Sequence, residues 1–315
     1  MKADFRIVVF VALLLGTSGC GGIRIEDVTP RAAPIVEHQV TLLYTGDSRG
    51  AVEPVKECAC YDRPAPALGG LGRRAAYVRQ VRAAEGGVLL LDAGDTVADP
   101  DEPHPDPAER LRVARAIGAM AYDAVAPGRA EIRGAATAAD GWVAALGAPL
   151  LAANLRGGDS LPRQAALIKE VAGARVAVLG AVGASAVPPS LQADLGVGVD
   201  PAAAALRARV ASARSSADLV IVLFHGTFDE ARELASGLEG IDVVVAAQRA
   251  GLPHGTAQAG RALVVEALPD GQHVGHLRLA VRGRGQVAAL ADDRVTLDET
   301  YPEDPAVADL LGAGR

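Results

Sequence analysis

Residues 218–225 read DLVIVLFH, an apolar run without the alternation of a half-exposed strand. Such a run is typical of a strand that is buried on both faces, as in a parallel sheet covered by helices. The runs VTLLYT (40–45) and GVLLLD (87–92) are similar, and helical patterns occupy 70–84 and 201–215. This alternation predicts an α/β fold with helices on both faces of its sheets.

Two further stretches set expectations about topology. Residues 135–146 have the spacing of one helix. The runs ALVVEAL (262–268) and VGHLRLAV (274–281) flank Asp270-Gly271, a residue pair that favours tight hairpins. We therefore expect an antiparallel hairpin here, which would make the sheet mixed.

The beginning of the sequence has the features of an export signal. Lys2 and Arg6 precede an apolar run at 7–16, which is too short to span a bilayer, and Cys20 follows small residues. We predict a lipoprotein signal peptide at 1–19 and a lipidated tether at 20–38. An ordinary cleaved signal with an unmodified cysteine is the alternative.

These features predict a location in the cell envelope. A lipid on Cys20 would make the membrane a partner and leave the protein facing the periplasm. Gly21 stands where some lipoproteins carry the aspartate that retains them at the inner membrane, so the outer membrane is favoured. The net charge of −7 offers no basic surface for nucleic acid.

Polar side chains follow several of the predicted strands. In open α/β sheets, ligands gather at the carboxyl ends of the strands. At these positions the sequence has Asp47, Asp95, the segments 128–131 and 247–250, and His225. We expect these residues to converge on one site.

The same segments carry a family resemblance, because seven of them occur in order between about residues 39 and 295. They resemble the catalytic domain of 5′-nucleotidases and related calcineurin-like phosphoesterases. The segments are YTGDSRG (44–50), GGLGRRAAYV (69–78), LLLDAGD (89–95), YDAVAPGRAEIRG (122–134), LLAANL (150–155), DLVIVLFHG (218–226) and GIDVVVAAQRA (240–250). The resemblance implies a four-layer α/β/β/α sandwich with mixed sheets over 39–298.

The resemblance also implies phosphoester hydrolysis on two metal ions that one aspartate bridges. Asp47, Asp95 and His225 match three of the family's seven ligands. The other four ligand positions have Arg49, Arg129, Gln248 and Ala250, the last two within Ala247-Gln248-Arg249-Ala250, and Ala130 stands where the family has the histidine that positions the transition state. Gln248 could be a weak oxygen ligand. We therefore expect Mn, Zn or Fe to bind weakly or not at all, and leave enzymatic activity open.

The replacements suggest a second kind of site. Guanidinium groups bind phosphate and carboxylate through paired hydrogen bonds, so Arg49, Arg129 and Arg249 are candidates for binding phosphate or another small anion. Alternatively, each arginine forms an ion pair with Asp47 or Asp95. An active hydrolase that uses Asp47, Asp95 and His225 is the competing hypothesis for function.

Cys58 and Cys60 form a third candidate site. One intervening residue would close a small, strained disulfide ring, and strained disulfides are the readily reduced ones. A redox or metal-binding pair competes with a structural disulfide or two free thiols. The CAC insert before GGLGRR also resembles a subgroup of exported nucleotidase-like proteins with cysteine or selenocysteine there.

Several remaining residues are expected to have no catalytic role. We expect Asn154 to pack beside the site, and His104, in the proline- and acid-rich loop 99–106, to be solvated. His254, His273 and His276 are interpreted as surface or hairpin residues. Residues 299–315 are predicted to be a tail, and the nucleoside-binding second domain that the resemblance implies is expected to be absent from this sequence.

Overall fold

The computed structural model describes residues 37–56, 66–136, 141–248 and 253–312. Its helices are α1 (Leu71–Ala84), α2 (Pro107–Ala119), α3 (Arg129–Ala136), α4 (Trp142–Leu146), α5 (Pro189–Leu195), α6 (Ala202–Ser216), α7 (Phe228–Gly237) and α8 (Pro305–Gly312). Its strands are β1 (His38–Thr45), β2 (Val55–Lys56), β3 (Ala67–Leu68), β4 (Val88–Asp92), β5 (Ala124–Val125), β6 (Leu155–Gly157), β7 (Ala166–Val171), β8 (Ala174–Val182), β9 (Val197–Val199), β10 (Leu219–His225), β11 (Val243–Ala246), β12 (Thr256–Ala259), β13 (Ala262–Glu266), β14 (His273–Val281) and β15 (Val287–Thr296).

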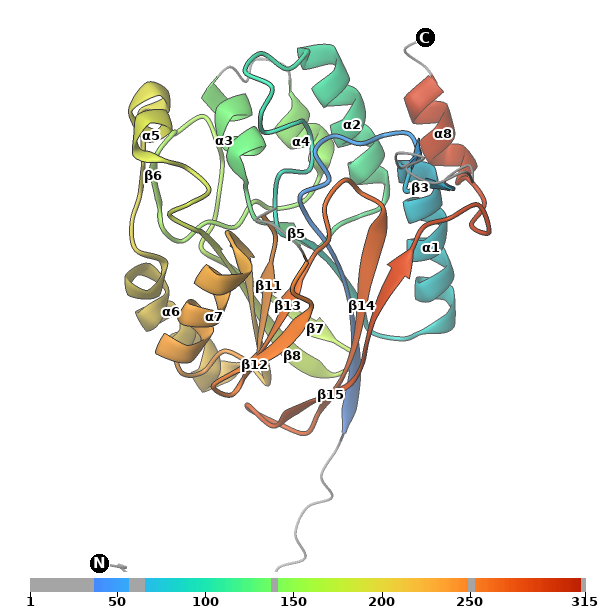
Figure 1. Cartoon of the computed structure of the whole chain (residues 1–315). Coiled ribbons are helices and arrows are strands. Elements are labelled where there is room, and N and C mark those ends of the chain that lie inside the picture. Colours follow the sequence, from blue (N-terminus) through green and yellow to red (C-terminus); the bar gives the residue numbers. More distant parts are fainter. Residues whose placement is uncertain (1–36, 57–65, 137–140, 249–252, 313–315) are drawn as a thin grey trace, which may run out of the picture. The chain divides into compact units, whose positions relative to one another are not determined.

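Two mixed sheets form the centre of the domain that these residues build (Figure 1). The five-stranded sheet has the order β15-β14-β1-β4-β5, in which β1 is parallel to β4 and antiparallel to β14. The six-stranded sheet has the order β12-β13-β11-β10-β8-β7, with parallel strands at its centre and antiparallel strands at both edges.

Alternate residues along each strand feed different layers of the core. In β10, Ile221 and Leu223 face the other sheet, whereas Val222 and Phe224 pack beneath α6 and α7. In β1, Leu43 belongs to the cluster beneath α1, α2 and α8. The fold is therefore an α/β/β/α sandwich, and the predicted fold class is confirmed. Apolar runs without alternation result because both faces of each central strand are buried.

Most of the elements expected from the sequence are present within a residue or two of their predicted ends. The strand predicted at 40–45 is β1, the helix at 70–84 is α1, and the helix at 201–215 is α6. The single helix predicted at 135–146 is wrong. Helix α3 instead begins at Arg129, inside one of the matched segments, and α4 begins only at Trp142.

The predicted hairpin around Asp270-Gly271 is also wrong. Strand β13 pairs with β11 and β12, whereas β14 pairs with β1 and β15 in the other sheet. Asp270 and Gly271 do have positive φ angles of 60° and 66°, as the residue types predict. The turn carries the chain between the sheets, and the Asp270 N–H donates to the Asp47 carbonyl at 2.9 Å.

The two ends of β1 have different surroundings. At its start, His38 Nδ1 bonds the Ala172 carbonyl in the β7–β8 turn, and Glu37 pairs with Arg282 beyond β14. At its other end the chain enters the loop that contains Asp47. Within the part of the chain described here, no helix is long and apolar enough to cross a membrane.

Candidate functional site

The loops after β1 and β4 lie against each other and form the base of the site. The Asp47 N–H donates to the Gly94 carbonyl at 2.6 Å, and the Arg49 N–H donates to the Asp95 carbonyl at 2.7 Å. Asp47, Arg49 and Asp95 have φ angles of 48°, 56° and 52°, a region that residues with a Cβ seldom adopt. Such backbone is typical of functional loops, because the surrounding structure must compensate for the strain.

Asp95 and His225 meet in the interior. The Nε2 atom of His225 lies 3.1 Å from Asp95 Oδ2, and both side chains are almost fully buried. His225 Nδ1 lies 2.8 Å from the Ala93 carbonyl oxygen. Both ring nitrogens therefore face acceptors, which only the doubly protonated ring can satisfy.

The pKa shifts of Asp95 and His225 agree with a doubly protonated His225 ring. Burial lowers the pKa of His225, but the Asp95 carboxylate outweighs burial and raises that pKa to about 9. Burial raises the pKa of Asp95, while His225 and the Ala130 N–H lower it, and the net shift is downward. Asp95 is thus held as a carboxylate against an imidazolium.

Glu131 holds the second loop in place. Its carboxylate is fully buried and accepts from the backbone N–H groups of Asp95 and Gly128 through Oε2, and of Thr96 and Val97 through Oε1. Burial, and after it the Asp95 charge, raise the pKa of Glu131, although these N–H groups oppose the shift. The end of the matched segment 128–131 therefore shapes the loop that presents Asp95.

Arg49 lies among carboxylates at the outer side of the site. Its Nη2 donates to Asp99 Oδ1 at 2.6 Å and to Asp101 Oδ2 at 2.7 Å. Asp47 and Asp270 lie 3.9 Å from its Nη1 and Nε. Burial lowers the pKa of Arg49, but the carboxylates raise it, so the guanidinium is firmly charged.

Arg129 reaches the same acidic segment from α3. Its Nη1 lies 3.2 Å from Asp101 Oδ1, and its Nε donates to the Ala186 carbonyl at 3.1 Å. The structure therefore brings Arg49 and Arg129 together on one carboxylate. Asp101, in the loop to which the sequence analysis assigned no role in the site, is the partner that was missed.

Other candidate residues are placed differently. Gln248 Oε1 accepts from Ser185 Oγ at 2.9 Å, beside Glu230. Asn154 is buried and uses its amide to bond Val182 N–H, Val182 C=O and Asp200 C=O, which confirms the packing role expected of it.

His276 is not a surface residue. It lies buried in the middle of β14, where its Nδ1 bonds the Tyr77 hydroxyl at 2.7 Å. Its Nε2 lies 3.3 Å from Glu85. The residue reaches the interior because alternate β14 positions face α1.

Four candidates lie outside the described residues: Cys20, Cys58, Cys60 and Arg249. Lipidation of Cys20, the state of the Cys58–Cys60 pair and the participation of Arg249 stay predictions. Alkylation of Cys58 and Cys60 without reductant, followed by mass spectrometry, would contradict the disulfide if both thiols were modified.

Donor side chains for a metal are few. Among residues 37–56, 66–136, 141–248 and 253–312, no group of three or more His, Cys, Asp or Glu side chains is arranged to hold a metal ion. Asp95 and His225 are adjacent, but the neighbouring ligand loops present Arg49 and Arg129. A guanidinium cannot ligate a cation, so this donor set does not match the two-metal centre that the resemblance implies.

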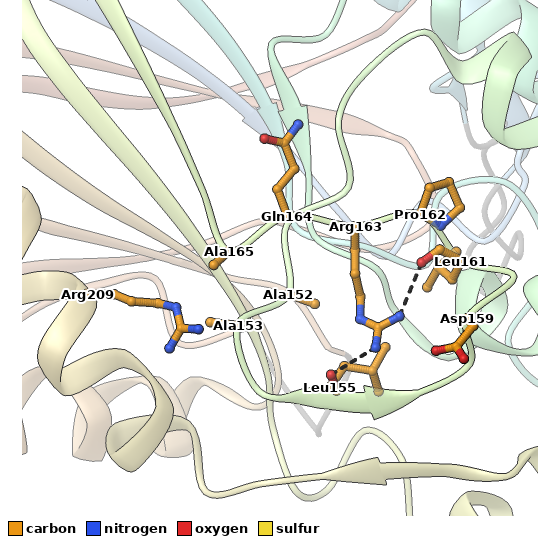
Figure 2. A pocket seen from close by; sticks show the side chains of 10 residues that line it. All are labelled: Ala152, Ala153, Leu155, Asp159, Leu161, Pro162, Arg163, Gln164, Ala165 and Arg209. Atoms are coloured by element: carbon orange, nitrogen blue, oxygen red, sulfur yellow. Dashed lines mark hydrogen bonds between the residues drawn. The ribbon is translucent and has the colours of Figure 1, made fainter.

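Two hollows among the described residues bear on where the site lies. One of about 200 Å³ is lined by Arg49, Ala98, Asp99, Glu102 and Arg110, among others. The other, of about 460 Å³, is lined by the segment 152–165 with Arg209 and by none of the predicted site residues (Figure 2).

Arg163, one of the two arginines that line the larger hollow, has a structural role. Figure 2 shows Arg163 pointing back toward its own loop, where it donates to the carbonyls of Leu155 and Leu161 at 3.1 and 3.2 Å. It also donates to the carbonyls of Gly157 and Gly158. The guanidinium group of Arg163 therefore stabilises its own loop. The candidate site is instead at Arg49, Arg129 and Asp95.

Comparisons with known proteins give similarities in sequence and in fold. No protein-family model matches the chain. The chain is 27% identical to human 5′-nucleotidase over 85% of its own length, and 26% identical to a snake venom 5′-nucleotidase of Naja atra over 85%. It covers 51% and 55% of these proteins, so it spans about half the length of the curated relatives it matches.

Solved structures share the fold. A 5′-nucleotidase precursor from Thermus thermophilus superimposes with a TM-score of 0.71 at 21% identity, over 87% of this chain and 58% of that one. The calcineurin-like phosphoesterase YfkN from Bacillus subtilis has a TM-score of 0.69 at 17% identity, over 88% and 97%. The chain is thus similar in sequence to 5′-nucleotidases, and it shares its fold with calcineurin-like phosphoesterases.

Proposed function

We propose that this chain is an envelope-tethered phosphoesterase-fold protein that binds a small oxyanion, with weak or no hydrolysis on a dinuclear metal centre. One observation carries the proposal: Arg49 and Arg129 each donate to a different oxygen of the Asp101 carboxylate. Two guanidinium groups that share one oxyanion in this way present the geometry by which arginine recognises phosphate and carboxylate. Phosphate is the simplest ligand of this class.

The charges around the site support weak metal binding. Only Asp47, Asp95 and His225 of the family's ligand positions keep donor side chains that match, whereas metal sites of high affinity need three or four ligands for each ion. Arg49 and Arg129 add positive charge where a cation would bind. Elemental analysis of the purified protein would contradict the proposal if it found two tightly held metal ions per chain.

Phosphate binding can be measured by isothermal titration calorimetry. We expect Arg49→Gln and Arg129→Gln each to weaken binding by at least about tenfold, because each removes a charged donor from the anion. Arg156→Gln is the matched control, since Arg156 forms an exposed ion pair with Asp200 at 2.8 Å and belongs to no candidate site. Equal phosphate affinity in all four proteins would exclude binding at the arginine pair.

An active metal-dependent hydrolase is the second candidate, and the orientation of His225 favours it. The hydrogen bond from Nδ1 to the Ala93 carbonyl directs Nε2 toward Asp95, the arrangement in which histidine ligands are usually held. In that role Asp47, Asp95 and His225 would hold the ion. Phosphoester turnover with added Mn, Zn or Fe that disappears in Asp95→Ala would establish this candidate.

The envelope tether is proposed from the sequence, and its test concerns Cys20. We expect the mature protein to carry lipid on this residue and to fractionate with membranes. Cys20→Ser should move the protein to the soluble periplasmic fraction, because the acyl chains supply the membrane affinity. Recovery of the unchanged protein in the soluble fraction would argue against the anchor.

A further inference from the structure

The acid-rich segment 99–106, with the sequence DPDEPHPD, lies directly over the arginine pair. Asp101 is its central contact, because one carboxylate oxygen is 2.7 Å from Arg49 Nη2 and the other is 3.2 Å from Arg129 Nη1. Asp99 adds a second carboxylate at 2.6 Å from the same Arg49 nitrogen. The segment thus supplies the oxyanion that the two guanidinium groups would otherwise take from solvent.

The backbone of this segment is held independently of those contacts. Arg133 Nη1 donates to the carbonyls of Pro100 and Glu102, one on each side of Asp101, at 2.8 and 2.9 Å. The Asp101 N–H also donates to Asp99 Oδ1 at 2.9 Å, although that oxygen itself accepts from Arg49. Rotation of the Asp101 side chain alone would therefore release the two guanidinium groups, with the loop left in place.

The exposure of the Asp101 side chain keeps the free-energy cost of this rotation small. The Asp101 side chain is 64% exposed, whereas those of Arg49 and Arg129 are 20% and 25% exposed. A released carboxylate would return to water and recover its hydration. Arg49 would keep its bond to Asp99 and Arg129 its bond to the Ala186 carbonyl, and each guanidinium group would have an N–H left for a new acceptor. The free-energy change for replacing the Asp101 carboxylate by another oxyanion is then small.

We propose that Asp101 is an internal ligand of the arginine pair, which competes with phosphate or a phosphoryl group for Arg49 and Arg129. This inference rests on the proposed anion-binding function and adds its regulation. Asp47, Asp99 and Asp270 remain near Arg49 when Asp101 leaves, so the wild-type chain binds phosphate weakly. Removal of the Asp101 charge strengthens binding because the competitor is lost.

Calorimetric titration of the purified wild-type, Asp101→Asn and Glu102→Gln proteins with inorganic phosphate tests this inference. Asp101→Asn should bind phosphate roughly tenfold more tightly than wild type, as expected for loss of a partly exposed pair of charged contacts. Glu102→Gln removes the same charge from the same loop, but its side chain bonds the His104 N–H. It should stay within about twofold of wild type.

The outcomes separate the two proposals. If wild type and Asp101→Asn bind phosphate equally, or if Glu102→Gln strengthens binding as much as Asp101→Asn, the internal-ligand proposal is overturned and anion binding stands. If none of the three proteins binds phosphate, the anion-binding function itself fails. A phosphate-soaked crystal structure with Asp101 turned away from Arg49 and Arg129 would support displacement directly.

Discussion

At the scale of single residues, the buried pair of Asp95 and His225 determines how the site responds to pH. The two side chains were identifiable from the sequence because they follow buried strands whose carboxyl ends meet. Their mutual protonation was not, since it depends on the Ala93 carbonyl and on complete exclusion from water. Burial and hydrogen-bond partners are tertiary properties that a strand pattern leaves undetermined.

The pair makes stability depend on pH in the metal-free protein. His225 has a raised pKa, so its contribution to the free energy of unfolding is complete below its ordinary value of 6.5 and is lost as the pH rises through about 9. The contribution of Asp95, whose pKa is lowered, is lost only as the pH falls through its folded value below 3.8. Both contributions to the free energy of unfolding are therefore complete between pH 3.8 and pH 6.5.

We therefore expect chelator-treated protein to lose about 3 kcal/mol of its free energy of unfolding between about pH 6 and pH 10. Denaturant unfolding across this range measures the loss. His225→Gln should be less stable at the lower pH and should show a much flatter profile. A wild-type profile as flat as that of the variant would contradict a protonated His225.

The contacts of Arg49 and Arg129 could be predicted only in part from the sequence. Arg49 and Arg129 could be assigned to strand-end loops from the matched segments. Their partners could not, because Asp99 and Asp101 belong to a proline-rich segment without periodicity, and its path over the site depends on Arg133 in α3. The dense alternation of acids and prolines at 99–106 was the available signal, and it indicated only an exposed loop.

At the scale of elements, the site depends on close approach of the loops after β1 and β11. Gly46 precedes Asp47, and a Cβ placed on it would lie 2.4 Å from the Cβ of Ala247. Ala247 is fully buried and its methyl group cannot rotate away. The lack of a side chain at Gly46 thus lets strand ends from the two sheets meet.

Gly46→Ala should destabilise the protein by about 1–3 kcal/mol, because the overpacked loops must separate. The control is Gly237→Ala at the end of α7, where an added Cβ meets nothing within 4 Å. That variant should be unchanged or more stable by up to about 1 kcal/mol, as alanine favours helix. Thermal unfolding of both compares them, and equal midpoints would show that the two sheets do not press on Gly46.

Elements buried on both faces were predictable, whereas their connections were less so. The strands β1, β4 and β10 follow from uninterrupted apolar runs, and α1 and α6 from helical spacing. A tight turn at Asp270-Gly271 was predicted correctly, but the strands on its two sides were wrongly expected to pair with each other. Its residues set the backbone angles, but the choice of sheet for β14 is made by pairing with β1, more than two hundred residues earlier.

At the scale of the whole described domain, α8 closes the outer face of the five-stranded sheet beside α1 and α2 (Figure 1). Residues 299–315 were expected to be a tail, and the structure has helix α8 (Pro305–Gly312) there. Val307 and Leu311 are buried in the cluster that includes Leu71 and Ile117. In so short a segment, amphipathic spacing alone gives little evidence for a helix. The packing of α8 against the domain is what stabilises it.

A matched pair of leucines tests this packing. Leu311 is 8% exposed and Leu310 is 36% exposed. Leu311→Ala should cost about 2–3 kcal/mol of the free energy of unfolding, since it leaves a cavity beneath the helix, while Leu310→Ala should cost less than about 1 kcal/mol. Denaturant unfolding would refute a docked α8 if the two variants were equally stable.

The direction of β1 has a consequence for what can reach the site. The chain enters β1 at His38 beside the β7–β8 turn and leaves it at Thr45, two residues before Asp47. Eight residues of strand span roughly 25 Å. Within the described domain, a probe attached at Glu37 would therefore lie at the opposite end of this strand from the loop that carries Asp47 and Arg49.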